Sequence, residues 1–188
     1  LGTYLVKLSG SLSGHDSNEA AKLLRIIGDF ERISDHAVNV LESVEEMKDK
    51  NIVFTQEAQS EMKVLTGAVS EVLDLACRAF EENDLEAATL VEPLEQVVDD
   101  MRDQIKLNHI IRLQKSECTI EHGFILSDIL NNFERISDHC SNIAVATIEA
   151  RNDSFDTHHY LNAVKYGDDS FNKVFDEYNR KYDLHADK

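Results

Sequence analysis

The sequence Phe-Glu-Arg-Ile-Ser-Asp-His occupies residues 30–36 and occurs again, without a change, at residues 133–139. The two copies are 103 residues apart, and an asparagine follows each copy at the same distance, at Asn39 and Asn142. Seven identical residues do not recur by chance in a chain of 188 residues, so the sequence contains an internal duplication. Apolar residues recur three and four positions apart around both copies, and this spacing predicts that each copy lies on a helix.

The duplicated stretch carries acidic residues in a helical line. Its Glu and Asp are four positions apart, which places them one turn apart on the same side of a helix. With the asparagine, the lines are Glu31, Asp35 and Asn39 in the first copy, and Glu134, Asp138 and Asn142 in the second. Two carboxylates so placed repel each other unless positive charge lies near them. Solvent or the motif arginines could supply it on an exposed face, but the unchanged duplication favours a hard cation bound by oxygen ligands.

A further acidic pair, Glu95 and Asp99, precedes the second copy at the same four-residue spacing. With residues placed at intervals of about 100° around the helix, this pair and the pair Glu134 and Asp138 border the apolar face on the same flank. The connection between the two helices is short, so we expect antiparallel packing, in which equal flanks meet. The four carboxylates should then converge along one groove. No lysine stands at the matching positions, so their repulsion would require bound cations.

Composition excludes several classes of protein. The formal net charge is −17, which makes nucleic acid and anionic membrane surfaces unsuitable partners. The apolar runs are far shorter than a membrane span, and no signal peptide is recognisable. The three cysteines have neither the number nor the spacing of a disulfide framework or a zinc site, and Cys140 is expected to be a small buried apolar residue. The lack of a disulfide framework favours a reducing, cytoplasmic compartment.

The sequence predicts an all-α protein. It contains one proline and no tryptophan, 42% of its residues are apolar, and no stretch alternates as a strand would. The first eight residues resemble the tail of a helix, and a Ser- and Gly-rich loop follows over residues 9–16. Ser17 or Asn18 should cap the next helix, Asn83 and Glu86 have capping-box spacing, and Pro93 should kink or restart its helix. The expected helices span residues 17–50, 55–82, 83–115, 120–151 and 154–182.

The acidic motifs resemble those of the PhoU family of phosphate-uptake regulators. Both copies look like the duplicated E-R-I-G-D motif of that family, with Ser34 and Ser137 in place of the usual glycine. The segment 95–99 matches its companion E/D-x-x-x-D motif. The resemblance implies tandem three-helix bundles, each binding a multinuclear iron or zinc cluster through these carboxylates. It also implies a first bundle truncated at its N-terminus, with residues 1–50 as its remainder, 51–152 as the second bundle and 153–188 as a C-terminal helix.

The resemblance also carries the functional prediction. The tail from Ser154 to Lys188 is rich in Tyr and His and contains Tyr178-Asn-Arg-Lys-Tyr182. It is similar to the end of the cytoplasmic PhoU-like domain of bacterial sodium/phosphate cotransporters. We therefore expect a metal-binding regulatory domain on the cytoplasmic side of the membrane, joined to a transporter membrane domain in the same chain. Phosphate at the metal site and a homodimer are further expectations. The alternative is a free-standing PhoU-type regulator of phosphate transport and signalling.

Two other classes compete with this prediction. Helical di-iron oxidases place a histidine three residues after a glutamate, and no histidine here has a glutamate at that position. No P-loop, G-x-S-x-G or Cys–His nucleophile pattern is present, so no catalytic residue is assigned and an enzyme is not expected. The remaining alternative class is a metal-free helical interaction module. If the groove does bind metal, Mg²⁺ or Ca²⁺ could take the place of iron or zinc. His36 and His139 point away from the carboxylate flank and are expected at the surface or between bundles, while Asp29 and Asp128 are expected on solvated faces.

Overall fold

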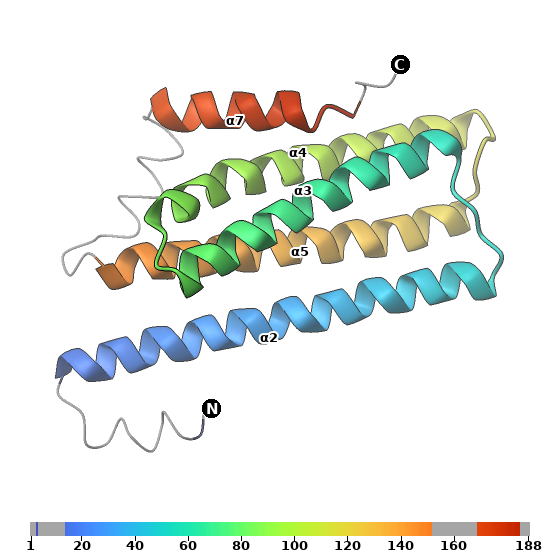
Figure 1. Ribbon diagram of the computed structural model, residues 1–188. Coiled ribbons are helices and arrows are strands. Elements are labelled where there is room, and N and C mark those ends of the chain that lie inside the picture. Colours follow the sequence, from blue (N-terminus) through green and yellow to red (C-terminus); the bar gives the residue numbers. More distant parts are fainter. Residues whose placement is uncertain (1–2, 4–13, 152–168, 185–188) are drawn as a thin grey trace.

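The computed structural model describes residue 3, residues 14–151 and residues 169–184 of the chain. Within these residues the chain forms helices and no strand, so the predicted all-α class is confirmed. The helices are labelled in Figure 1. Their bounds are α2 Gly14–Asp49, α3 Gln56–Glu81, α4 Leu85–Gln114, α5 Ile120–Arg151 and α7 Asp169–Lys181. The expected tail of a helix over residues 1–8 lies outside the described residues except for residue 3, and so do residues 154–168 of the expected last helix.

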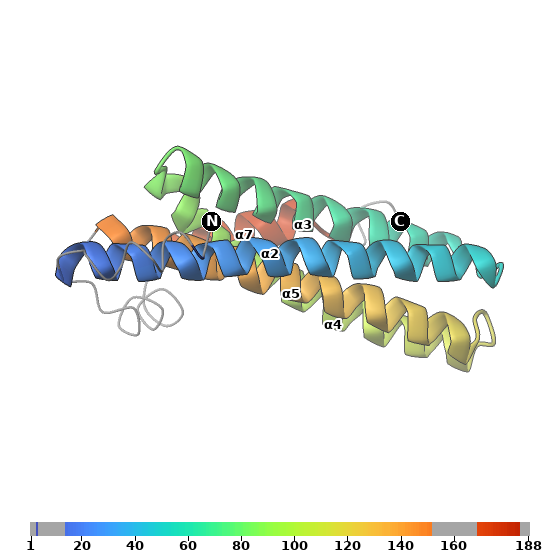
Figure 2. The same ribbon diagram turned by 90° about the horizontal axis from the view of Figure 1, so that it is seen from below.

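Three consecutive helices, α3, α4 and α5, pack side by side with alternating directions (Figures 1 and 2). Helix α2 packs along α5, and the short helix α7 packs on α4. The interior of α3, α4 and α5 is formed by large side chains with no exposed surface, among them Leu65, Val72, Leu94, Ile105, Leu130 and Ile143. Burial of these side chains from all three helices supplies most of the driving force for the packing. The division of the chain at residues 50 and 152 stays a prediction.

The two copies of the repeated stretch face each other across α2 and α5, which run in opposite directions (Figure 1). His36 Nδ1 lies 2.8 Å from Asn132 Oδ1, and His139 Nδ1 lies 2.9 Å from Asp29 Oδ1. Asp29 and Asn132 are equivalent at the 103-residue offset, and so are His36 and His139. The two contacts are therefore equivalent by pseudo-symmetry: in each, a motif histidine of one repeat contacts the polar residue before the motif in the other. The two imidazole rings stack with centroids 5.8 Å apart. The duplicated helices are thus related by pseudo-symmetry, and both histidines lie between the repeats.

One expectation about this interface is wrong, because Asp29 is buried and does not lie on a solvated face. It occupies the side of α2 that packs on α5, where His139 provides a hydrogen-bonding partner for its carboxylate. Asp128 is exposed, as expected. Cys140 is fully buried, also as expected, and burial raises the pKa of its thiol.

Helix ends differ from the expected ones at three places. Helix α2 begins at Gly14, three residues before the expected caps, because extending an existing helix adds one hydrogen bond for each residue fixed. Helix α4 does not restart at Pro93, which is buried in the packed interior of a continuous helix. The cap of α4 is Asp84, whose Oδ1 accepts a hydrogen bond from the Ala87 amide at 3.1 Å. Asn83 instead takes a left-handed backbone conformation, with a φ of 52°, in the turn between α3 and α4.

The Asp84 cap predicts a pH dependence of stability. The hydrogen bond from the Ala87 amide, together with Arg78, holds the pKa of Asp84 below its ordinary value of 3.8. A carboxylate with a lowered pKa in the folded state stabilises the fold fully above the unfolded pKa, and this contribution is lost as pH falls through the folded pKa. We therefore expect Asp84→Ala to lower the melting temperature at neutral pH, and the difference from wild type to shrink below pH 3.8. Thermal unfolding across the acid range measures it.

Glu86→Ala is the matched control for this cap, because Glu86 is the other acidic residue at the start of α4. Glu86→Ala should have the smaller effect on the melting temperature, because Asp84, not Glu86, accepts the cap hydrogen bond from the Ala87 amide. A difference between Asp84→Ala and wild type that is constant down to the lowest pH would contradict the assignment.

Helix α7 is held by aromatic and charged side chains. Tyr178 is buried, and Lys181 Nζ lies 2.5 Å from Glu71 Oε2 on α3. Tyr182 donates a hydrogen bond to the same carboxylate, and its ring lies over Gly67, 3.6 Å from the position of an added Cβ. The last helix is therefore docked along α3 and α4, on the side of α4 away from α2 (Figure 1).

Helix α2 carries an exposed apolar stripe. Leu23, Leu41 and Val44 keep 40%, 57% and 48% of their surface exposed. Their equivalents in α5, at an offset of 103 residues, are Leu126, Ala144 and Thr147, and all three are buried. The duplicated helices therefore share a sequence pattern but differ in how much of it is covered, because α3 and α4 pack on α5.

Candidate cation groove between α4 and α5

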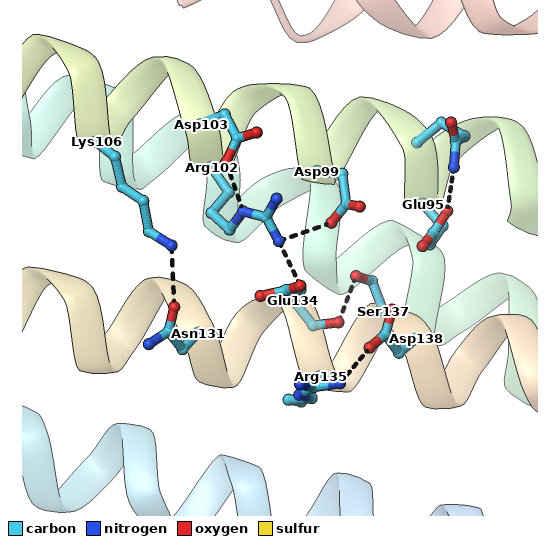
Figure 3. A network of polar contacts seen from close by, with 11 residues as sticks. Glu95, Asp99, Arg102, Asp103, Lys106, Asn131, Glu134, Arg135, Ser137 and Asp138 are labelled. Carbon is cyan, nitrogen blue, oxygen red and sulfur yellow. Dashed lines mark hydrogen bonds and ion pairs between the residues drawn. The ribbon is translucent and has the colours of Figure 1, made fainter.

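Three of the four predicted groove carboxylates meet where α4 and α5 pack in antiparallel orientation (Figure 3). Asp99 of α4 faces Glu134 and Asp138 of α5, and all three side chains are partly exposed. Both α5 carboxylates lie close enough to Asp99 to repel its charge. These three residues therefore lie on the flanks of α4 and α5 that helical spacing predicts.

Arg102 lies among these carboxylates, and the sequence reasoning missed it. Its Nη1 forms an ion pair with Glu134 Oε1 and lies 3.4 Å from Asp99 Oδ1. Its Nε donates a hydrogen bond to Asp103 Oδ1 at 3.0 Å. The guanidinium thus links α4 to α5 and has a side chain that is only 15% exposed (Figure 3). The sequence signal for it is an arginine three positions after Asp99, because residues three apart are neighbours on a helix surface.

Two other polar contacts lie near the groove, one within α5 and one between α4 and α5 (Figure 3). Arg135 Nη1 donates a hydrogen bond to Asp138 Oδ2 at 3.1 Å. Lys106 Nζ of α4 donates to Asn131 Oδ1 of α5, also at 3.1 Å. A motif arginine therefore neutralises one acidic residue of the line, as the simpler interpretation of the duplicated stretch expected.

The charges of the groove act on the pKa of Asp99 in opposite directions. Burial raises the pKa of this carboxyl, Arg102 opposes the rise, and the charges of Glu134 and Asp138 add to it. The pKa of Arg102 is also raised: burial works against its charge, but the hydrogen bonds to Asp103 and Glu134 outweigh that effect. The guanidinium is therefore permanently charged, and the surrounding carboxylates are its counter-ions.

Glu95, the fourth predicted residue, lies one turn along α4 from Asp99 (Figure 3). It is buried, and its Oε2 accepts a hydrogen bond from Gln96 Nε2 at 3.1 Å. The structure thus brings together three of the four carboxylates and places Glu95 beside them.

The first copy of the motif does not contribute to this groove. Glu31, Asp35 and Asn39 are exposed on α2, and Asn39 Nδ2 donates to Asn132 Oδ1 at 3.2 Å. Asn142, the secondary candidate of the second copy, is also exposed. The carboxylates of the first copy therefore face solvent.

The donor set has the chemistry that iron, zinc, Mg²⁺ or Ca²⁺ would need, since these ions accept carboxylate oxygens. The arrangement is different. Among the described residues, no three His, Cys, Asp or Glu side chains are placed so that they could hold a metal ion. At the centre of the predicted groove the Arg102 guanidinium forms an ion pair with Glu134 Oε1 and lies 3.4 Å from Asp99 Oδ1, a buried oxygen that has no hydrogen bond among the described residues. The side chains as placed do not fit a metal cluster, and the predicted iron or zinc cluster stays a prediction.

Comparison with known proteins identifies the family. The PhoU domain matches residues 3–44 and 63–147, and each match includes one copy of the repeated stretch. The chain belongs to the PhoU domain family. The all-α fold agrees with the PhoU resemblance that the motifs predicted, and the second match covers most of α4 and α5, which form the groove.

Two curated PhoU proteins of Thermotoga maritima are similar to the chain. The phosphate-specific transport system accessory protein PhoU homolog 1 is 27% identical over 126 residues, which are 67% of this chain and 53% of the relative. Homolog 2 is 26% identical over 128 residues, covering 68% and 51%. The chain spans about half the length of these relatives. No solved structure matches it. Among the described residues, no helix has the length and apolar character needed to cross a bilayer.

Proposed function

We propose that this PhoU domain regulates phosphate uptake from the cytoplasmic side of the membrane, as part of a sodium-dependent phosphate transporter. The observation that carries the proposal is the pair of PhoU domain matches, one around each copy of the repeated stretch. Both curated relatives are named as accessory proteins of phosphate-specific transport systems. A regulatory role in transport is therefore the function that agrees with the family and with the absence of a recognised catalytic motif in the sequence.

The surface charge supports a protein partner of this kind. The chain has a net charge of −17, which disfavours nucleic acid and anionic lipid. Cytoplasmic loops of membrane proteins carry an excess of lysine and arginine. An acidic helical domain is complementary to such loops, and contact with them would couple the domain to the transport pathway without any catalytic step.

Phosphate uptake by the complete transporter tests the proposal. Cells without other phosphate uptake would express the full-length protein, with or without this domain, at equal membrane levels. Regulation predicts that uptake of labelled phosphate changes about fivefold or more between replete and starved cells only when the domain is present, which is the range typical of allosteric coupling. Equal uptake by both proteins under both conditions would overturn the proposal.

The alternative is a free-standing PhoU regulator that acts on a separate transporter. The names of the two Thermotoga relatives favour it, since both are accessory proteins. Membrane fractionation of the native protein separates the two cases. A transporter domain predicts that an antibody against this chain detects a large integral membrane protein, whereas a free regulator predicts a band released from membranes by salt.

A further inference from the structure

We propose that Arg102 is the resident cation of the groove between α4 and α5 and takes the place of bound metal there. This role of Arg102 depends on the chemistry of the groove and does not require that the domain regulate a transporter. It follows from the disagreement between the carboxylate motifs, which predict a metal cluster, and the side chains that the fold brings together.

The contacts of Arg102 are those expected of a bridging cation. One guanidinium nitrogen contacts Glu134 on α5 and lies 3.4 Å from Asp99 on α4, while Nε donates to Asp103 (Figure 3). A metal ion in this groove would bind the same Asp99 and Glu134 oxygens. Because the guanidinium offers five donors in a planar fork, it contacts Asp103 and Glu134 at once and places its charge 3.4 Å from Asp99 Oδ1, without the fixed coordination shell that a divalent ion requires.

Burial distinguishes Arg102 from Arg135, the arginine that contacts Asp138 on α5. The Arg102 side chain is 15% exposed, whereas that of Arg135, which contacts only Asp138 in the ion pairs described, is 60% exposed. An exposed pair of this kind exchanges easily with solvent ions. Arg102 instead links two helices, and its departure would leave Asp99 and Glu134 facing each other without an intervening positive charge. A divalent ion can therefore bind these oxygens only by displacing Arg102.

The wild-type chain provides the first test. Protein expressed in medium supplemented with iron and zinc would be analysed by native mass spectrometry and by elemental analysis, and melted with and without a chelator. We expect far less than one ion per chain and the same melting temperature in both conditions. One or more tightly bound ions per chain, whose removal lowers the melting temperature, would overturn the proposal.

Arg102→Gln provides the second test, with Arg135→Gln as its matched control. Titration calorimetry with Mn²⁺ and with Zn²⁺ should show about tenfold or more tighter binding by Arg102→Gln than by wild type. Arg135→Gln should bind like wild type, and adding Glu134→Gln to Arg102→Gln should abolish the gain. Arg102→Lys, which keeps the positive charge, should also bind metal no better than wild type. Equal affinity of Arg102→Gln and wild type for both ions would overturn the proposal, and the wild-type metal content decides it if Arg102→Gln does not fold.

Discussion

Replacing Arg112 by alanine should lower the free energy of unfolding by about 3–5 kcal/mol, because it leaves the charge of Glu61 buried without its partner. Arg112 Nη1 donates a hydrogen bond to Glu61 Oε1 at 2.9 Å, and Nη2 lies 2.9 Å from Oε2. Both side chains are less than a tenth exposed, and Asn108 donates a further hydrogen bond to Oε1 at 2.8 Å. The pair joins α3 to α4 at the end of the bundle that contains the connection from α4 to α5. Urea unfolding measures the change.

The double variant Glu61→Leu with Arg112→Met is the control for this pair. Exchange of a complete buried ion pair for apolar side chains of similar size is often neutral or stabilising. The double variant should therefore regain most of the stability that Arg112→Ala loses. A loss below about 1 kcal/mol for Arg112→Ala would show that water reaches Glu61 and that the pair behaves as a surface pair.

The second large effect is expected at Leu130, where alanine should cost about 2–5 kcal/mol. Leu130 has no exposed surface and lies in the interior formed by α3, α4 and α5, so truncation leaves a cavity that the surrounding helices fill only in part. The midpoint of urea unfolding should fall while the slope stays unchanged. The measurement also tests whether α5 is as tightly packed as its position in the bundle indicates.

Leu41→Ala is the matched control, because it is the same substitution in the duplicated helix α2. Leu41 is 57% exposed, so its truncation should change the free energy of unfolding by no more than about 0.5 kcal/mol. Similar losses for Leu41→Ala and Leu130→Ala would mean that the stripe on α2 is covered in solution, and that the two repeats are packed alike.

Much of the groove was predictable from sequence because it depends on local periodicity. Helical spacing places Asp99 on one flank of α4 and Glu134 and Asp138 on the same flank of α5. The short connection between the helices makes their antiparallel packing the expected arrangement. For Glu95, helical spacing predicts the side of the helix but not the contacts. Its angle about the helix axis is right, but its contacts depend on the neighbouring Gln96 and on its burial, which periodicity does not specify.

Capping shows the same division at a smaller scale. Thr55, where the sequence places the start of a helix, caps α3 with its side-chain oxygen 3.3 Å from the Ala58 amide. At the start of α4, two adjacent residues, Asn83 and Asp84, are both suitable caps. The backbone of the turn decided between them, because Asn83 adopts the left-handed conformation and Asp84 the extended one that a cap requires.

The sequence by itself determined the all-α class, the duplication, the PhoU resemblance and the side of each helix on which the acidic residues lie. These follow from residue spacing along single helices, which a chain carries before it folds. Only the tertiary structure decided that Arg102 reaches Glu134, that Arg112 meets Glu61, 51 residues away, and that Asp29 is buried against His139. The physical reason is that these contacts depend on the distance between two packed helices and on the reach of long side chains, and neither is encoded in the spacing of residues on one helix.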